Sequence, residues 1–166
     1  MPFTPLHFGP GAALHSVAPA RVSFLAFCAA NILVDVEPLY YMLTEQYPIH
    51  RFFHTYVGVS IVIVLTVALF VVLPHPARLP NVFGWKDLRP GQIALGALLG
   101  GFSHIVLDSV MHEDIRPLAP FSAANVLYQR VSIDTLHVLC LAAGAVGLFV
   151  LGVRRISGAA TTHPRS

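Results

Sequence analysis

Long apolar runs separated by short polar segments are the feature of this sequence that most constrains its fold. The chain is 55% hydrophobic and only 11% charged, whereas soluble domains are typically about 25% charged. Residues 56–73 contain no charged residue and are long enough to cross the hydrocarbon core of a bilayer as one helix. Three further runs cover residues 22–34, 92–111 and 138–153, and the first of them can continue toward residue 42. We therefore predict an all-α fold, a polytopic membrane helix bundle with about four transmembrane helices.

A shorter apolar segment precedes these runs. Residues 6–18 can form a helix of roughly 20 Å, which would cross a bilayer only in part. The sequence Pro19-Ala20-Arg21 then turns the chain into the next run. We expect this hairpin to bring His7 to the level of Asp35.

Length and cysteine content bound the organisation of the chain. We predict one membrane domain, residues 1–156, followed by a small polar tail, residues 157–166, that is disordered. Cys28 and Cys140 both lie inside apolar runs, which favours buried thiols over a disulfide. The Lys and Arg residues form no basic stripe, so we expect no binding of nucleic acid.

The basic residues predict an orientation in the membrane. Of the 10 Lys and Arg residues, most lie on one side of the predicted bundle, namely Arg21, Arg78, Lys86, Arg89, Arg154, Arg155 and Arg165. The opposite side has Arg51, Arg116 and Arg130. The positive-inside tendency places the first set in the cytoplasm, so the second set faces outward.

Histidines and carboxylates gather at the outward ends of the apolar runs. They fall at helical spacings, as Asn31 and Asp35, His50 and His54, His104 with Asp108 and His112, and Asp134 with His137. Residues four apart lie on one face of a helix, and ionisable groups in membrane segments are functional-site candidates. Imidazole and carboxylate are also the ligands of zinc and similar ions. The pattern therefore indicates a metal site built between facing helices on one side of the membrane.

Each group also has a structural interpretation. His50 and His54 can be interfacial residues, and His104 with Asp108 can form an internal hydrogen-bonded pair. Asp134 and His137 can form a pair in which the carboxylate orients the imidazole without either side chain binding an ion directly. We expect two loop carboxylates, Glu113 and Asp114, to be solvated. Three glycines, Gly96, Gly100 and Gly101, are expected to permit close helix packing.

Four short motifs are spread over most of the chain, from the N-terminal segment to about residue 120. In chain order they are Pro5-Leu6-His7, Val34-Asp35-Val36-Glu37-Pro38, His50-Arg51-Phe52-Phe53-His54-Thr55 and Gly101-Phe102-Ser103-His104-Ile105-Val106-Leu107-Asp108, followed by Pro117-Leu118-Ala119-Pro120. With these motifs the chain resembles the YdjM-type membrane-bound metal-dependent hydrolases of bacteria. The pattern of that family has an early His, Pro-Asp-x-Asp, His-Arg-Gly-x-Thr-His-Ser and Ser-His-x-x-x-Asp.

The chain departs from the family pattern at several positions. Val34 replaces the proline, Glu37 replaces the second aspartate, and the His-Arg element is one residue shorter, so that His54 follows His50 at i+4. The resemblance implies a divalent metal and hydrolytic activity in the cytoplasmic (inner) membrane of a bacterium.

The residue clusters and the resemblance together lead to one leading hypothesis, a membrane-embedded metal-dependent hydrolase whose site faces the outer side. The expected metal ligands are His7, Asp35, His50, His54, His104 and Asp108. Zn²⁺ is the expected ion, with Mn²⁺ or Fe²⁺ as alternatives. Glu37 or another nearby carboxylate is the expected general base, and Arg51 is expected to hold an anionic oxygen. Besides the lipid bilayer, the expected partner is an amphipathic or phosphoester substrate.

Three alternatives use the same residues without hydrolysis. A metal-binding or transport protein would need polar groups that continue to the inner side of the membrane. The runs at residues 56–73 and 138–153 have almost no polar groups there besides Thr66. A haem protein needs axial ligands on facing helices, and the accompanying carboxylates argue against it. In a structural or assembly protein, the polar cluster would only pack the bundle.

Overall fold

The structure is a computed structural model that describes residues 5–72 and 81–161. Every regular element in these ranges is helical, which confirms the predicted all-α class. The elements, in chain order, are η1 (Pro5–His7), α1 (Phe8–Val17), α2 (Phe24–Val34), α3 (Val36–Leu43), α4 (Tyr56–Val72), η2 (Val82–Asp87), α5 (Pro90–Met111) and α6 (Ile133–Thr161).

Three helical segments are long and apolar enough to span a membrane, which indicates a membrane protein. They are Phe24–Leu43, formed by α2 and α3 together, the whole of α5, and Ile133–Ser157 of α6. The helix α4 is equally apolar but has only 17 residues, and the last residue of its predicted run lies outside the described residues. The helix α1 has 10 residues, in agreement with the short N-terminal helix that was predicted.

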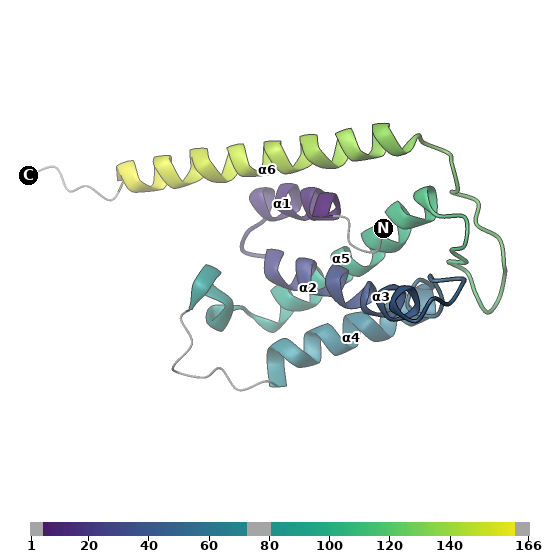
Figure 1. The fold of residues 1–166 in the computed structure, drawn as a ribbon. Coiled ribbons are helices and arrows are strands. Elements are labelled where there is room, and N and C mark those ends of the chain that lie inside the picture. The colour runs from purple at the N-terminus through teal and green to yellow at the C-terminus, as the bar shows by residue number, and fades with distance from the viewer. Residues whose placement is uncertain (1–4, 73–80, 162–166) are drawn as a thin grey trace, which may run out of the picture.

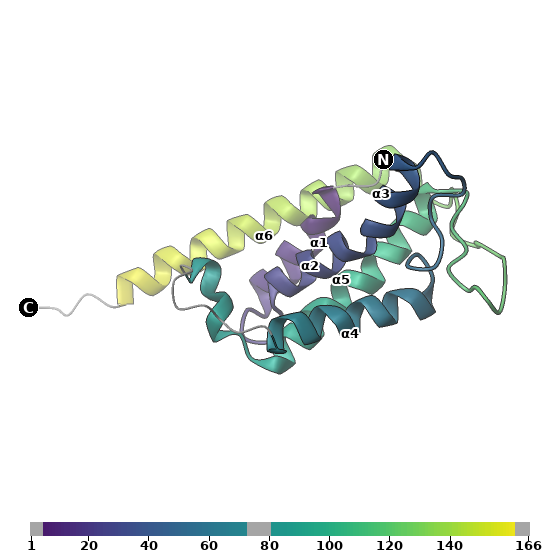
Figure 2. The ribbon, with the colours of Figure 1, turned by 60° about the horizontal axis from the view of Figure 1, so that its bottom comes forward.

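The helix α5 lies at the centre of the bundle, with α2 and α4 packed against it, while α6 runs along α1 (Figures 1 and 2). One buried apolar cluster joins α2 to α5 through Ala26, Ala30, Ile93 and Ala97. A second joins α2, α4 and α5 through Val34, Val59, Val62 and Ile105. Large apolar side chains such as Val64 on α4 and Phe149 on α6 remain exposed, as expected for helix faces turned toward lipid.

Small residues allow α2 and α5 to approach each other at backbone distance. A Cβ atom added to Gly96 would overlap the carbonyl oxygen of Ser23, and one added to Gly100 would overlap that of Phe27. Close approach through small residues is a common way for membrane helices to associate. The packing role predicted for these two glycines is confirmed.

The ends of the helices place the polar residues at one end of the molecule. The loops after α3 and after α5 meet at the end where α6 begins, whereas η2 lies at the opposite end (Figure 1). A hydrogen bond of 2.8 Å from the Tyr56 amide to the Pro117 carbonyl joins the two loops. At the other end, the helix α6 continues through Thr161, beyond the boundary predicted at residue 156. Arg78 and Arg165, used for the orientation, lie outside the described residues.

The contact at Gly100 can be tested by adding a single methyl group. Because the new Cβ would overlap the backbone of α2, we expect Gly100→Ala to lower the stability of the bundle by about 1–3 kcal/mol. Gly91→Ala is the matched control, since a Cβ at Gly91 meets nothing within 4 Å. Thermal unfolding in detergent measures both. Equal melting temperatures for the two variants would contradict the close contact.

Candidate metal centre

Four buried side chains converge between α2, α4 and α5. They are Asp35, His54, His104 and Asp108, and one possible ligand atom from each lies within 4.8 Å of those of the other three. All four residues are at most 4% exposed. We call this set the inner cluster.

The imidazole nitrogens of the inner cluster point at the carboxylates. His104 Nε2 lies 3.2 Å from Asp35 Oδ1 and 3.2 Å from Asp108 Oδ2. His54 Nε2 lies 3.4 Å from Asp108 Oδ2 and 3.8 Å from Asp35 Oδ1. Next to these four, His7 Nε2 lies 3.4 Å from Asp108 Oδ1. The hairpin predicted for the N-terminal segment therefore brings His7 to the cluster.

Most of these atoms make no hydrogen bond although they are buried. Within the described part of the chain, the set includes both ring nitrogens of His7 and His54, His104 Nε2, Asp35 Oδ1 and Asp108 Oδ1. A buried polar atom left without a partner costs about 1–3 kcal/mol, and native structures contain few of them. Nitrogen and carboxylate oxygen lone pairs that converge without hydrogen bonds fit a shared divalent cation, because such an ion accepts all of them at once.

The fixed ring orientation of His104 supports this interpretation. The side-chain amide of Asn31 donates from Nδ2 to the Phe27 carbonyl at 2.9 Å, which leaves Oδ1 to accept from His104 Nδ1 at 3.0 Å. With its proton on Nδ1, His104 presents the lone pair of Nε2 to the two aspartates. Metal-binding histidines commonly hold their second nitrogen in this way.

Local sequence explains how the ligands reach one point. His104 and Asp108 lie one turn apart on α5. Asp35 lies where α2 ends and α3 begins, because Pro38 lacks an N–H group and cannot bond the carbonyl four residues earlier. His54 lies in the turn before α4, where Gly58 provides the room, since a Cβ there would overlap the Phe52 carbonyl oxygen.

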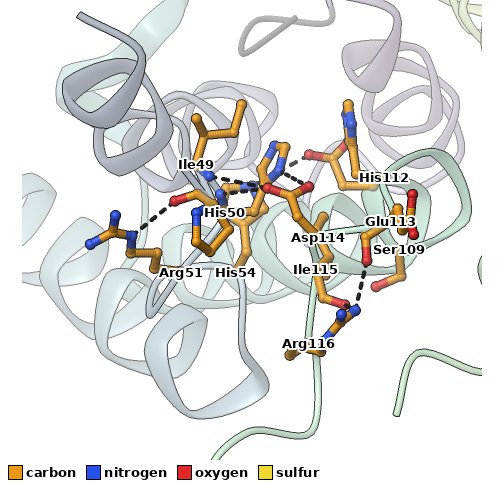
Figure 3. A network of polar contacts seen from close by, with 12 residues as sticks. Ile49, His50, Arg51, His54, Ser109, His112, Glu113, Asp114, Ile115 and Arg116 are labelled. Carbon is orange, nitrogen blue, oxygen red and sulfur yellow. Dashed lines mark hydrogen bonds and ion pairs between the residues drawn. The ribbon is translucent and has the colours of Figure 1, made fainter. Parts of the chain in front are cut away.

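His50 lies beside the inner cluster and is held by a carboxylate from the loop after α5. Its ring centroid is 4.7 Å from that of His54, and its Nδ1 lies 2.8 Å from Asp114 Oδ1. The amides of Ile49 and His50 donate to Asp114 Oδ2 at 3.1 and 3.2 Å. Figure 3 shows this carboxylate facing the His50 ring and the adjoining backbone. Burial opposes ionisation of Asp114, but the hydrogen bonds from His50 and Ile49 outweigh it and lower the pKa of the carboxyl group. The expectation that Asp114 is solvated was wrong.

The two residues predicted to act catalytically lie outside the inner cluster. Glu37 accepts the backbone N–H groups of Phe52 and Phe53, at 3.1 Å on Oε1 and 2.6 Å on Oε2, so its carboxylate positions the loop that holds the histidines. Arg51 places its guanidinium 3.7 Å from the ring centroid of Tyr41 and donates from Nε to the Pro48 carbonyl at 2.8 Å.

Other candidate residues from the sequence are placed elsewhere. Asp134 is exposed at the start of α6 and His137 is half-buried, and neither belongs to the inner cluster, because α6 packs mainly along α1. Cys28 and Cys140 are free thiols, as predicted, but only Cys140 is buried and Cys28 is half-buried.

A cavity of about 520 Å³ opens beside the inner cluster. Its polar lining residues include His50, Arg51, Asp114 and Arg116. The other lining residues are largely apolar and include Tyr47, Pro48, Phe52, Ala119 and Pro120. Because His50 lines the cavity and also touches His54, the cavity reaches the edge of the cluster.

The chain matches no family model, no curated protein and no solved structure. The resemblance to the YdjM-type hydrolases therefore stays a prediction from the sequence, and the geometry of the cluster carries the functional argument.

The positioning role of Glu37 leads to a stability prediction. Gln at this position keeps one acceptor but turns an amide N–H group toward the other backbone donor, so we expect Glu37→Gln to cost about 1.5–3 kcal/mol of unfolding free energy. Glu45→Gln, an exposed position on the neighbouring turn, is the matched control. The measurement is chemical denaturation in detergent. An unchanged unfolding midpoint for Glu37→Gln would argue against a stabilising role of the two hydrogen bonds that Glu37 accepts.

Proposed function

We propose that this protein is a metal-dependent hydrolase of phosphoesters, including lipid-like ones, in the YdjM-type family, with its site at the outer face of the membrane. One observation carries the proposal, the buried convergence of two imidazoles and two carboxylates, most of whose facing atoms make no hydrogen bond. A structural core of this kind would be expected to satisfy these atoms, since unpaired buried polar groups are costly.

Asp35, His54, His104 and Asp108 would hold the ion. Imidazole nitrogens and carboxylate oxygens suit Zn²⁺, and Mn²⁺ or Fe²⁺ also fits this set. When bound there, the ion would supply Lewis acidity and would lower the pKa of water at the site toward neutrality. Asn31 orients His104, and the surrounding apolar clusters limit the access of bulk water.

The cavity favours an amphipathic anion as the substrate. Arg51 and Arg116 are among the residues that line it, and guanidinium groups pair with phosphate oxygens through charge-assisted hydrogen bonds. The apolar remainder suits a hydrocarbon chain or another apolar group that enters from the membrane boundary. A phosphoester with an apolar substituent can contact both the arginines and the apolar lining residues.

Hydrolysis adds one water molecule across the ester bond. The water oxygen bonds to phosphorus, the P–O bond to the alcohol breaks, and the alcohol leaves with a proton. One proton from the water passes through a carboxylate at the cavity, for which Glu113 is the candidate by position. Glu37 is less suited to this role, since both its oxygens already accept backbone N–H groups.

Removal of cluster carboxylates tests the metal site. We expect the purified protein to contain a divalent metal, and Asp35→Asn and Asp108→Ala to lose it along with phosphoesterase activity, because each removes an anionic ligand. Asp134→Asn is the matched control, since Asp134 is exposed and outside the cluster. Plasma mass spectrometry and a phosphoester screen before and after chelation measure both properties. Retention of metal and activity in Asp108→Ala would refute the proposal.

The role of the two arginines that line the cavity is tested separately. A charge-assisted hydrogen bond contributes about 1.5–3 kcal/mol, so we expect Arg51→Gln to raise KM for an anionic phosphoester by about 10- to 100-fold with the metal retained. Arg130→Gln, exposed in the loop before α6, should leave KM unchanged. An identical rise in both variants would point to a general charge effect instead.

A further inference from the structure

A second group of possible ligands adjoins the inner cluster and shares one residue with it. His50, Asp108 and His112 each place one possible ligand atom within 4.8 Å of those of the other two. His112 follows directly after α5, and His50 lies in the loop before α4. We call this set the outer cluster.

We propose that the outer cluster binds a second divalent cation and that Asp108 is shared between the two ions. This inference rests on the proposed metal centre and extends it from one ion to two. The donors are again imidazole nitrogens and carboxylate oxygen, so the ion belongs to the same class, Zn²⁺ or Mn²⁺.

The environment of His50 is that of an oriented ligand. Asp114 Oδ1 receives its Nδ1–H, and the other oxygen of Asp114 is engaged by two backbone N–H groups. The proton is therefore held on Nδ1, and Nε2 keeps its lone pair. An imidazole backed by a carboxylate in this way is the usual arrangement of a metal-binding histidine. The His50 side chain is only 1% exposed, so its orientation is set by the protein.

His112 faces His50 at short range. The two ring centroids are 4.4 Å apart and the rings are inclined by 34°. The position of His112 is fixed by the end of α5, where its amide donates to the Asp108 carbonyl at 2.9 Å. Asn125 Nδ2 further donates to the carbonyls of Ser109 and His112 at 2.9 and 3.3 Å. Two imidazoles held this close to a buried carboxylate are well placed to share one cation.

Asp108 is the residue that belongs to both groups of possible ligands. Its Oδ2 faces His54 and His104 of the inner cluster. Its Oδ1 lies apart from this contact, is buried without a hydrogen bond, and has His7 Nε2 at 3.4 Å. Each oxygen therefore has its own surroundings.

The second position lies on the substrate side of the centre. His50 lines the cavity, whereas none of the other inner or outer cluster residues does. In two-metal sites, the ions are about 3.5–4 Å apart and stabilise both the attacking and the leaving oxygen of a phosphoryl transfer. A centre of two ions next to the arginines of the cavity would therefore support phosphoester hydrolysis as the reaction.

The test is the number of Mn²⁺ ions bound by the full chain in detergent after chelation. Calorimetric titration gives the stoichiometry, and electron paramagnetic resonance distinguishes a coupled ion pair from an isolated ion. We expect two ions and a coupled spectrum for the parent, and one uncoupled ion for His112→Ala, whose half-buried position favours folding of the variant. Asp114→Asn, which weakens the orientation of His50, should lower affinity for the second ion by about 10- to 100-fold. His15→Gln, on α1 and outside both clusters, should still bind two.

The outcomes separate the two proposals. One ion per chain in both the parent and His112→Ala would overturn the second position and leave the inner site intact. Two ions in His112→Ala and in Asp114→Asn, with affinities equal to the parent, would also overturn the outer cluster. Absence of any ion in the parent would remove the metal centre as a whole.

Discussion

The burial of the Asp108 carboxylate is the constraint on which the rest of this structure depends. It lies in an apolar bundle, on a helix that is long and apolar enough to span a membrane, where an ionised group needs strong compensation. Three histidines, His7, His54 and His104, aim ring nitrogens at it from three separate segments. Their hydrogen bonds do not account for the arrangement, because most of the facing atoms have none. A cation held at this point would account for both the burial and the convergence.

The helix packing delivers these groups to one place. The glycines of α5 let α2 approach at backbone distance, which brings Asn31 and Asp35 onto the face that carries His104 and Asp108. Pro38 interrupts the helix at Asp35, and Glu37 fixes the following loop through two backbone amides. The polar end is thus built by elements whose own roles are structural. The Thr66 hydroxyl, in the inner half of α4, bonds the Val62 carbonyl, so it adds no support for an ion path across the bundle.

Local sequence patterns were sufficient to predict the helices and most of the inner cluster. His104 and Asp108 share a helix face by spacing alone, and the position of Asp35 and His54 at run ends indicated that they would meet them. Glu37, two residues after Asp35, was predicted to act as a general base. Residues two apart on a helix do not face each other, however, and its side chain points to the loop.

The contributions of the loops depended on their path in space. Asp114 was expected to be solvated, but the loop after α5 folds over the start of α4 and carries this carboxylate to His50. The spacing of apolar and polar residues in the sequence does not predict the path of such a loop. The position of Asp134 outside the inner cluster has the same kind of cause, because α6 packs along α1 and leaves this residue exposed. Arg116, which joins Arg51 at the cavity, likewise comes from a loop.

The most direct test of the central claim is X-ray absorption spectroscopy of the protein purified with its own metal. The account predicts a first shell of nitrogen and oxygen at about 2.0–2.2 Å for zinc, with the outer-shell scattering of imidazole rings. A shell containing sulfur, or an ion without imidazole scattering, would contradict a centre built from Asp35, His54, His104 and Asp108.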